Sequence, residues 1–254
     1  MIHLHHLAIW LLLAVAAIPL SAQQFPEEEE ETRQNLPEWL IRLSNMKAEQ
    51  KQAYVRTFTL AKQAFLAEEW VTCIRLLNDC DMLLPGNPNV WNLRVSCLTE
   101  QQYYDEAEQE LQKVRQVLPE DPVTLVNIAN LHLARGNYQE CIEEINELLT
   151  RIPAYGTEPL RHILQYRILL SHLMLGNESA AREITKGLSP LLSDTPLYYY
   201  GEAAFHIFHG RRSQAMQDIQ AADNIFAKGN ATQPYRRALA ASGLIAKHLS
   251  EPQP

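Results

Sequence analysis

The chain has 254 residues, which is long enough to bury a substantial hydrophobic core. Its formal net charge is −8, and the run Glu27–Glu31 supplies five of the negative charges. The nearly balanced remainder lacks the basic surface that nucleic-acid binding requires, so a nucleic-acid partner is excluded.

Residues 1–22 have the pattern of a secretory signal peptide. The apolar run Leu7–Leu20 is shorter than the roughly 20 residues that cross a bilayer as a helix, and small residues follow it at Ser21 and Ala22. We therefore expect an exported protein, periplasmic or extracellular, with no membrane span after signal cleavage. The alternative is an uncleaved signal that anchors the protein in the inner membrane.

Two short segments precede the main body of the chain. The acidic residues 23–36 predict a solvated, disordered linker. Residues 37–53 predict an N-terminal capping helix, because Leu36–Met46 could cover the apolar end of a helical body.

Residues 54–155 carry three markers that recur every 34 residues. The markers are a proline, an aromatic residue and a small residue, at Pro85, Pro119 and Pro153, at Trp70, Tyr104 and Tyr138, and at Cys73, Ala107 and Cys141. Long amphipathic stretches between the markers, without an alternating strand pattern, predict helices. A small side chain lets two helix axes approach closely, and a proline cannot continue the helix that it follows.

This pattern resembles the tetratricopeptide repeat (TPR) family. In that family's frame the three repeats are residues 54–87, 88–121 and 122–155. The resemblance implies an all-α fold, a right-handed superhelix of about five helix pairs with a C-terminal capping helix.

Two divergent repeats follow an expected insertion at residues 156–161. They span 162–229, with the boundary after Thr195, and Gly176 and Gly210 fall in their helix-to-helix turns. Gly187 and Pro190 should shorten the second helix of the first of them. Residues 230–254 predict a single capping helix, Tyr235–Leu249, and a tail.

The chain contains none of the short catalytic motifs, so we expect no enzyme, no cofactor and no metal. His132, His172 and His206 occupy the same position of three successive first helices. They are either a proton-sensitive seam or partly buried aromatic residues, each satisfied by one hydrogen bond.

The four cysteines fit small buried positions of the repeat. Cys73 and Cys80 cannot pair, because two helical turns separate them. A disulfide between Cys80 and Cys97 is conceivable, since their helices should pack together.

The resemblance implies that the first helices of the pairs line a concave groove. The candidate groove residues are polar in the middle and aromatic toward the end, namely Lys62, Asn92, Ser96, Asn127, Asn130, Leu133, Tyr166, Arg167 and Tyr200. Carboxamides can donate to and accept from a peptide backbone, and aromatic pockets take apolar side chains. The alternative for the asparagines is an ordinary solvated helix surface.

These features predict a non-enzymatic scaffold of the cell envelope that binds a protein or an extended peptide in its groove. One alternative is a periplasmic chaperone for an exported or secreted substrate. A second alternative is a fixed structural subunit of an envelope assembly, which should carry a large apolar patch on its convex face or terminal helices. The sequence specifies neither the partner nor the oligomeric state.

Overall fold

The computed structural model describes residues 37–119, 121–151, 158–190, 195–227 and 230–249. Within these ranges the chain forms thirteen helices and no strand. The predicted signal peptide, 1–22, and the acidic linker, 23–36, lie outside the described residues. The chain divides into two compact units, whose described parts are 37–124 and 125–249, and we consider each by itself.

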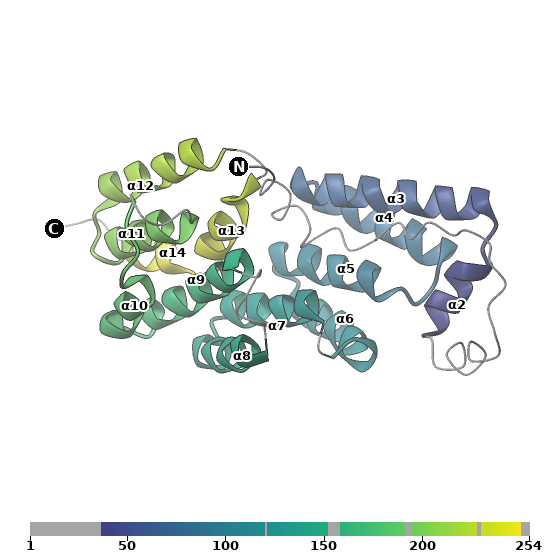
Figure 1. Ribbon diagram of the computed structural model, residues 1–254, viewed down its shortest axis with the longest axis horizontal. Helices are drawn as coiled ribbons and strands as arrows, with labels where there is room; N and C mark the ends of the chain where they lie inside the picture. Colours follow the sequence, from purple (N-terminus) through teal and green to yellow (C-terminus); the bar gives the residue numbers. More distant parts are fainter. Residues whose placement is uncertain (1–36, 120, 152–157, 191–194, 228–229, 250–254) are drawn as a thin grey trace, which may run out of the picture. The chain divides into compact units, whose positions relative to one another are not determined.

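The first unit consists of a short N-terminal helix and two antiparallel helix pairs (Figure 1). Helices α3 and α4 form one pair, α5 and α6 form the next, and α4 packs against α5. The helices are α2 (Glu38–Asn45), α3 (Ala48–Leu66), α4 (Trp70–Leu83), α5 (Pro88–Glu100) and α6 (Tyr104–Val117). Helix α7 (Pro122–Arg135) begins in this unit and ends in the second one.

In the second unit, five helices from α8 to α12 precede two short C-terminal helices (Figure 1). Helix α9 contacts both α8 and α10, and α11 pairs with α12. The helices are α8 (Tyr138–Arg151), α9 (Glu158–Met174), α10 (Glu178–Thr185), α11 (Pro196–Phe208), α12 (Arg212–Ile225), α13 (Gln233–Ala241) and α14 (Leu244–Leu249).

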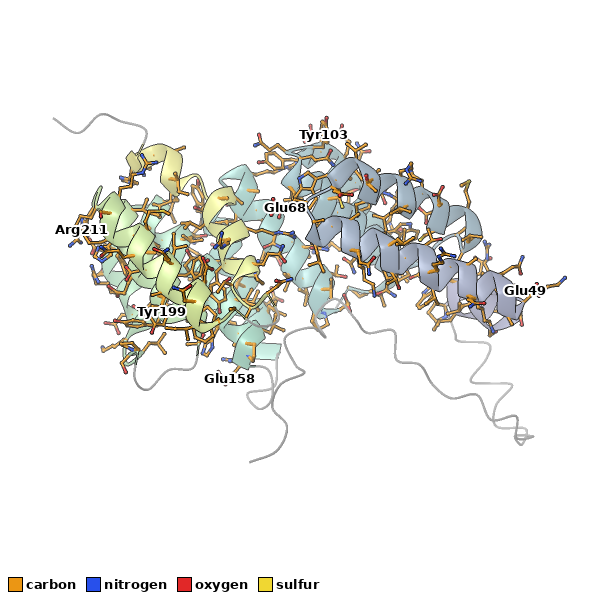
Figure 2. All side chains as sticks on the ribbon, turned by 90° about the horizontal axis from the view of Figure 1, so that it is seen from above. Glu49, Glu68, Tyr103, Glu158, Tyr199 and Arg211 are labelled. Carbon is orange, nitrogen blue, oxygen red and sulfur yellow. The ribbon has the colours of Figure 1, made fainter. Side chains whose placement is uncertain are left out.

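The predicted all-α fold is confirmed by the thirteen described helices, and the turn inside each helix pair agrees with the 34-residue spacing. One residue in each turn has a positive φ, namely Glu68, Gln102, Gly136, Gly176 and Gly210. The first three are 34 residues apart, as are the last two, so the same backbone turn recurs at the same place in every pair. Glu68 is labelled at its turn in Figure 2.

The small residues of the repeat lie where two helices meet. Ala61 and Cys73 are fully buried between α3 and α4, and Ala129 meets Cys141 across α7 and α8. The Cys141 Sγ lies 3.4 Å from the backbone oxygen of Ala129, a separation that a larger side chain would prevent. These positions set the close approach of the helices in these two pairs.

The start of the second repeat is fixed by a helix cap. Pro88 opens α5, and the side chain of the preceding Asn87 accepts a hydrogen bond from the backbone N–H of Asn89 at 3.0 Å. The amide nitrogen of Asn87 also donates to the hydroxyl oxygen of Tyr54 at 2.6 Å, which ties the cap back to the preceding first helix. One asparagine thus both starts a helix and joins two repeats.

Three predicted boundaries need correction. The expected single N-terminal helix is two helices: α2 ends at Asn45, and α3 starts at Ala48 rather than at Tyr54. Leu43 and Met46 nevertheless pack against the core of the first pair, as a cap would. Helix α9 starts at Glu158, inside the predicted insertion, so most of the insertion lengthens a first helix.

The C-terminal capping helix is also broken where one helix was expected. Gly243 has a φ of +76°, a left-handed conformation that ends α13 and lets α14 begin in a new direction. The short second helix that Gly187 and Pro190 predict is observed, because α10 ends at Thr185.

Candidate functional site

The structure divides the nine candidate groove residues into a buried and a partly exposed group. The first group is at most 4% exposed and comprises Asn92, Asn127, Leu133, Tyr166, Arg167 and Tyr200. The prediction that these six are open to a partner is therefore wrong for the chain as it is folded. Lys62, Ser96 and Asn130 are half-buried, and their partner-binding role stays a prediction.

Asn92 is buried because it joins two repeats. Its amide nitrogen donates to the hydroxyl of Thr124 at 3.1 Å and to the carboxylate of Asp121 at 3.4 Å. Asp121 also accepts from the backbone N–H of Thr124 at 2.9 Å and so caps α7. Asn92 has the same role for α7 that Tyr54 has for α5, which is to hold the cap of the next first helix.

The half-buried Asn130 supplies a partner for the buried Arg167. The Arg167 Nε donates to the side-chain oxygen of Asn130, and its terminal nitrogen donates to the backbone oxygen of Ile163 at 2.7 Å. Burial of the guanidinium requires such partners, because an unpaired buried charge is strongly destabilising. This contact links α7 to α9 within the second unit.

Tyr166 and Tyr200 are covered by the C-terminal helix α13. The ring of Tyr235, from α13, lies 5.2 Å from the ring of Tyr166 and 5.4 Å from that of Tyr200, between centroids. Burial raises the pKa of Tyr200 to about 12, and the nearby carboxylate of Asp223 acts in the same direction. The three rings form one buried aromatic cluster.

Polar contacts fasten the C-terminal helices over the first helices α9 and α11. Arg236 of α13 pairs with Asp223 of α12, and the Lys247 Nζ of α14 donates to the backbone oxygen of Met174 at 3.0 Å. Both α13 and α14 contact α9 and α11 (Figure 1). In the second unit, the first-helix face that the sequence predicted as a groove therefore holds a polypeptide segment already.

The sequence predicts that Tyr235–Leu249 caps the last helix pair. It does not predict that this segment covers the first helices of two pairs, α9 and α11. Its apolar spacing predicts a helix with one buried face, but spacing says nothing of which surface that face meets. Only the folded chain shows that Tyr235 reaches both Tyr166 and Tyr200.

The first unit keeps two candidate residues accessible on neighbouring first helices. The Lys62 ammonium on α3 lies 5.2 Å from the ring centroid of Phe58, and partial burial lowers the pKa of Lys62. Ser96, on α5, donates from its hydroxyl to the backbone oxygen of Asn92 at 3.2 Å. Figure 2 shows the side chains of this unit in a view turned by 90° from that of Figure 1.

An ion-pair network that the sequence did not indicate stiffens the same unit. Arg94 on α5 lies 2.5 Å from the carboxylate of Asp81 on α4 and 3.5 Å from that of Glu110 on α6. Its side chain is 11% exposed, so the network is shielded from much of the solvent. Because the partners come from three helices, no local sequence pattern could have revealed them.

The histidine column contains unsatisfied ring nitrogens. The Nδ1 atoms of His172 and His206 are buried without a hydrogen-bond partner in the described part of the chain. The Nε2 of His206 lies 3.4 Å from the carboxylate of Asp218. One hydrogen bond at Nε2 would satisfy the interpretation with one bond per ring, so that interpretation and the proton-sensitive seam both stay predictions. Among the described residues, no three His, Cys, Asp or Glu side chains are grouped to hold a metal ion.

The cysteine contact differs from the pairing considered from sequence. The Sγ of Cys97 lies 3.0 Å from the Sγ of Cys73, so the residue that Cys97 faces is Cys73 rather than Cys80. All four cysteines are buried, and none of them is bonded in a disulfide. The close packing of α4 on α5 decides which position of α4 meets Cys97.

Residues 98–155 match the family model described as tetratricopeptide repeat. A tetratricopeptide repeat protein from Parabacteroides merdae ATCC 43184 has a similar structure, with a TM-score of 0.56 and 15% sequence identity over 83% of this chain and 88% of that one. A thermophilic TPR protein in Thermus thermophilus has a TM-score of 0.55 and 16% identity over 74% of this chain and 99% of that one. The comparison with curated proteins gives no match.

These likenesses show a TPR solenoid fold and support the TPR family for this chain. Folds of this kind generally present extended surfaces for protein interaction. Among the helices that the structure describes, none is both long and apolar enough to cross a membrane.

Proposed function

We propose that the protein is a non-enzymatic scaffold that binds a polypeptide partner on the first-helix face of its N-terminal unit. The observation that carries the proposal is the packing of α13 against α9 and α11. It shows that first helices of this chain can bind a polypeptide segment. The corresponding helices of the first unit, α3 and α5, keep Lys62 and Ser96 partly exposed.

The chemistry of this surface indicates the kind of segment it would hold. The Lys62 ammonium offers hydrogen-bond donors beside the apolar ring of Phe58. Phe58 itself belongs to the core and is only 7% exposed, so the accessible group is the ammonium, and a peptide that places a carbonyl or carboxylate oxygen at Lys62 would satisfy its donors. A partner segment of that description agrees with the general interaction role of the fold.

Affinity capture from the native cell envelope tests this proposal. Lys62→Ala with Ser96→Ala should lose a protein that the unaltered chain retains, while Arg56→Ala, which removes an exposed charge from the same helix α3, should retain it. Matching circular dichroism would show that the variants are folded. Equal retention by all three proteins would contradict the proposal.

The structural-subunit alternative is favoured by one observation, two apolar side chains exposed on the second helix α4. Val71 is 78% exposed and Met82 is 75% exposed. A protein that is lost with Val71→Ser and Met82→Ser, yet retained with the Lys62 variant, would point to a fixed contact through α4. The chaperone alternative would instead give retention of many unrelated apolar peptides.

We also propose export to the periplasm or the cell exterior, supported by the pattern of residues 1–22. Cell fractionation followed by mass measurement of the N-terminal peptide checks this. A mature chain that begins at Gln23 in the exported fraction supports cleavage. An intact N-terminus in the membrane fraction would support the anchored alternative, and a cytoplasmic location would contradict both.

A further inference from the structure

We propose that Cys73 and Cys97 are a disulfide-forming pair that can covalently tie α4, the second helix of the first pair, to α5, the first helix of the next. Their sulfur atoms are 3.0 Å apart, about 1 Å longer than an S–S bond. They lie on facing segments of two helices that pack together, so bond formation needs only a small approach.

The surroundings distinguish this pair from the other cysteines. The hydrogen bond from the Cys97 thiol lowers the pKa of Cys73, with Arg94 acting in the same direction, whereas burial is the largest effect on Cys80 and raises its pKa to about 12. The Sγ of Cys141 contacts the backbone oxygen of Ala129 in the other unit. In the folded chain each of Cys73 and Cys97 therefore has the other as its neighbouring thiol, and Cys80 and Cys141 lie in different surroundings.

The reaction balances with a low-molecular-weight disulfide, such as oxidised glutathione, as the oxidant. The thiolate of one of the two cysteines attacks one sulfur of that disulfide, forms a mixed disulfide and releases one small thiolate. The thiolate of the other cysteine then attacks the protein sulfur of the mixed disulfide and releases the second small thiolate. The protein loses two protons and two electrons, and the oxidant is reduced to two thiols.

Both side chains are fully buried in the folded chain. Attack on an external disulfide therefore takes place while α4 and α5 are transiently apart or before they have packed. Once formed, the bond closes a loop between residues 24 positions apart and restricts the unfolded chain. Its structural effect is to fix α5, which carries Ser96, against the first helix pair.

The digestion pattern of the chain allows a direct assignment. Trypsin cleaves after Lys62, Arg75, Arg94 and Lys113, so Cys73, Cys80 and Cys97 fall in separate peptides, 63–75, 76–94 and 95–113. Cys141 falls in 136–151. Every possible pairing thus gives a different cross-linked peptide in a non-reducing mass map.

The experiment refolds the full chain in a glutathione redox buffer, blocks free thiols in denaturant and maps the tryptic peptides. We expect peptide 63–75 linked to 95–113, two blocked thiols in place of four, and a melting temperature about 5–10 °C above that of the reduced protein. Cys80→Ser should leave the link and the shift unchanged. Cys97→Ser should abolish both.

Three results would contradict the proposal, and none of them depends on whether a variant folds. One is the recovery of four free thiols from the unaltered chain after oxidative refolding, while circular dichroism shows it to be helical. The second is a link that involves peptide 76–94, which would assign the bond to Cys80. The third is an equal melting temperature for the reduced and the oxidised protein. It would show that the bond does not stabilise the contact of α4 with α5, which contradicts the proposed tie.

Discussion

The hydroxyl of Tyr138 donates a 2.9 Å hydrogen bond to the backbone oxygen of Ser242, a residue 104 positions later in the chain. The bond joins the first turn of α8 to the break between α13 and α14. A helix that starts in the third repeat is thus one anchor of the C-terminal segment that covers α9 and α11.

Tyr138→Phe should loosen that segment without disturbing the first unit. Loss of a partly buried hydrogen bond costs about 1 kcal/mol of unfolding free energy. Hydrogen exchange should speed up in residues 233–249 and stay unchanged in 37–119. Tyr103→Phe, at a tyrosine that is 53% exposed, is the matched control and should alter neither. Uniform acceleration across both units would contradict a local anchor.

Gly201→Ala should destabilise the second unit through a steric clash. A Cβ at this position of α11 would lie 2.7 Å from the Cγ2 of Thr185 on α10, closer than real contacts allow. Overpacking of this kind costs about 1–3 kcal/mol in a denaturant titration. Thr185→Ser removes the clashing methyl and should restore most of the loss in the double variant. Additive effects of the two changes would show that the contact is not the cause.

Asn92→Ala should lower stability rather than act only on partner binding. It leaves the hydroxyl of buried Thr124 without the donor that lies 3.1 Å away, at a cost of about 1–2 kcal/mol. Asn89→Ala, three residues earlier on α5, is the comparison and should change the unfolding free energy by less than about 0.5 kcal/mol. The midpoints of urea unfolding of the two variants measure the difference in stability. Equal midpoints would contradict a structural role of Asn92.

The aromatic cluster predicts opposite effects for two tyrosine hydroxyls. The Tyr166 hydroxyl is buried without a hydrogen-bond partner in the described residues, whereas that of Tyr200 lies 3.3 Å from the carboxylate of Asp223. Tyr166→Phe should raise the unfolding free energy by about 1 kcal/mol, since an unsatisfied polar group is removed. Tyr200→Phe should lower it by a similar amount. A loss of stability in both variants would indicate a partner for Tyr166.

Stability should fall as the pH drops below the ordinary pKa of histidine. Burial lowers the pKa of His172, and burial together with Arg161 lowers that of His162 despite the opposing charge of Glu158. Below about pH 6.5 these histidines are protonated in the unfolded chain but still neutral in the folded chain. Their contribution to the free energy of unfolding is therefore lost as the pH falls from about 6.5 through their lowered pKa values in the folded chain. His172→Gln should flatten the dependence of the urea midpoint between about pH 7.5 and 5.5. An unchanged slope would exclude His172 as a source.

Sequence periodicity was enough to place the helix pairs and their turns. The repeat at 34 residues locates the turn at Glu68, Gln102 and Gly136, and the small residues at Ala61 and Cys73 mark the helix contacts. These features depend on local backbone preference and side-chain volume, which are properties of neighbouring residues. For the same reason Gly187 predicted a short helix before it, and α10 does end at Thr185.

The candidate groove could not be placed from the sequence, because the exposure of a first-helix side chain depends on which distant segments of the chain pack over it. Asn92 points to a partner 32 residues away, and Tyr166 meets Tyr235 from the last helices of the chain. The same holds for Cys97, whose neighbour is selected by the packing of α4 on α5 and not by the spacing along either helix.

The sequence by itself therefore determined the repeat length, the helical class and the position of each turn, since periodic side-chain volume and backbone preference act locally. The tertiary structure alone decided which first-helix side chains remain accessible. Burial of apolar surface is indifferent to chain order, so α13 could settle on α9 and α11 and cover Tyr166 and Tyr200 while Lys62 and Ser96 stayed partly exposed.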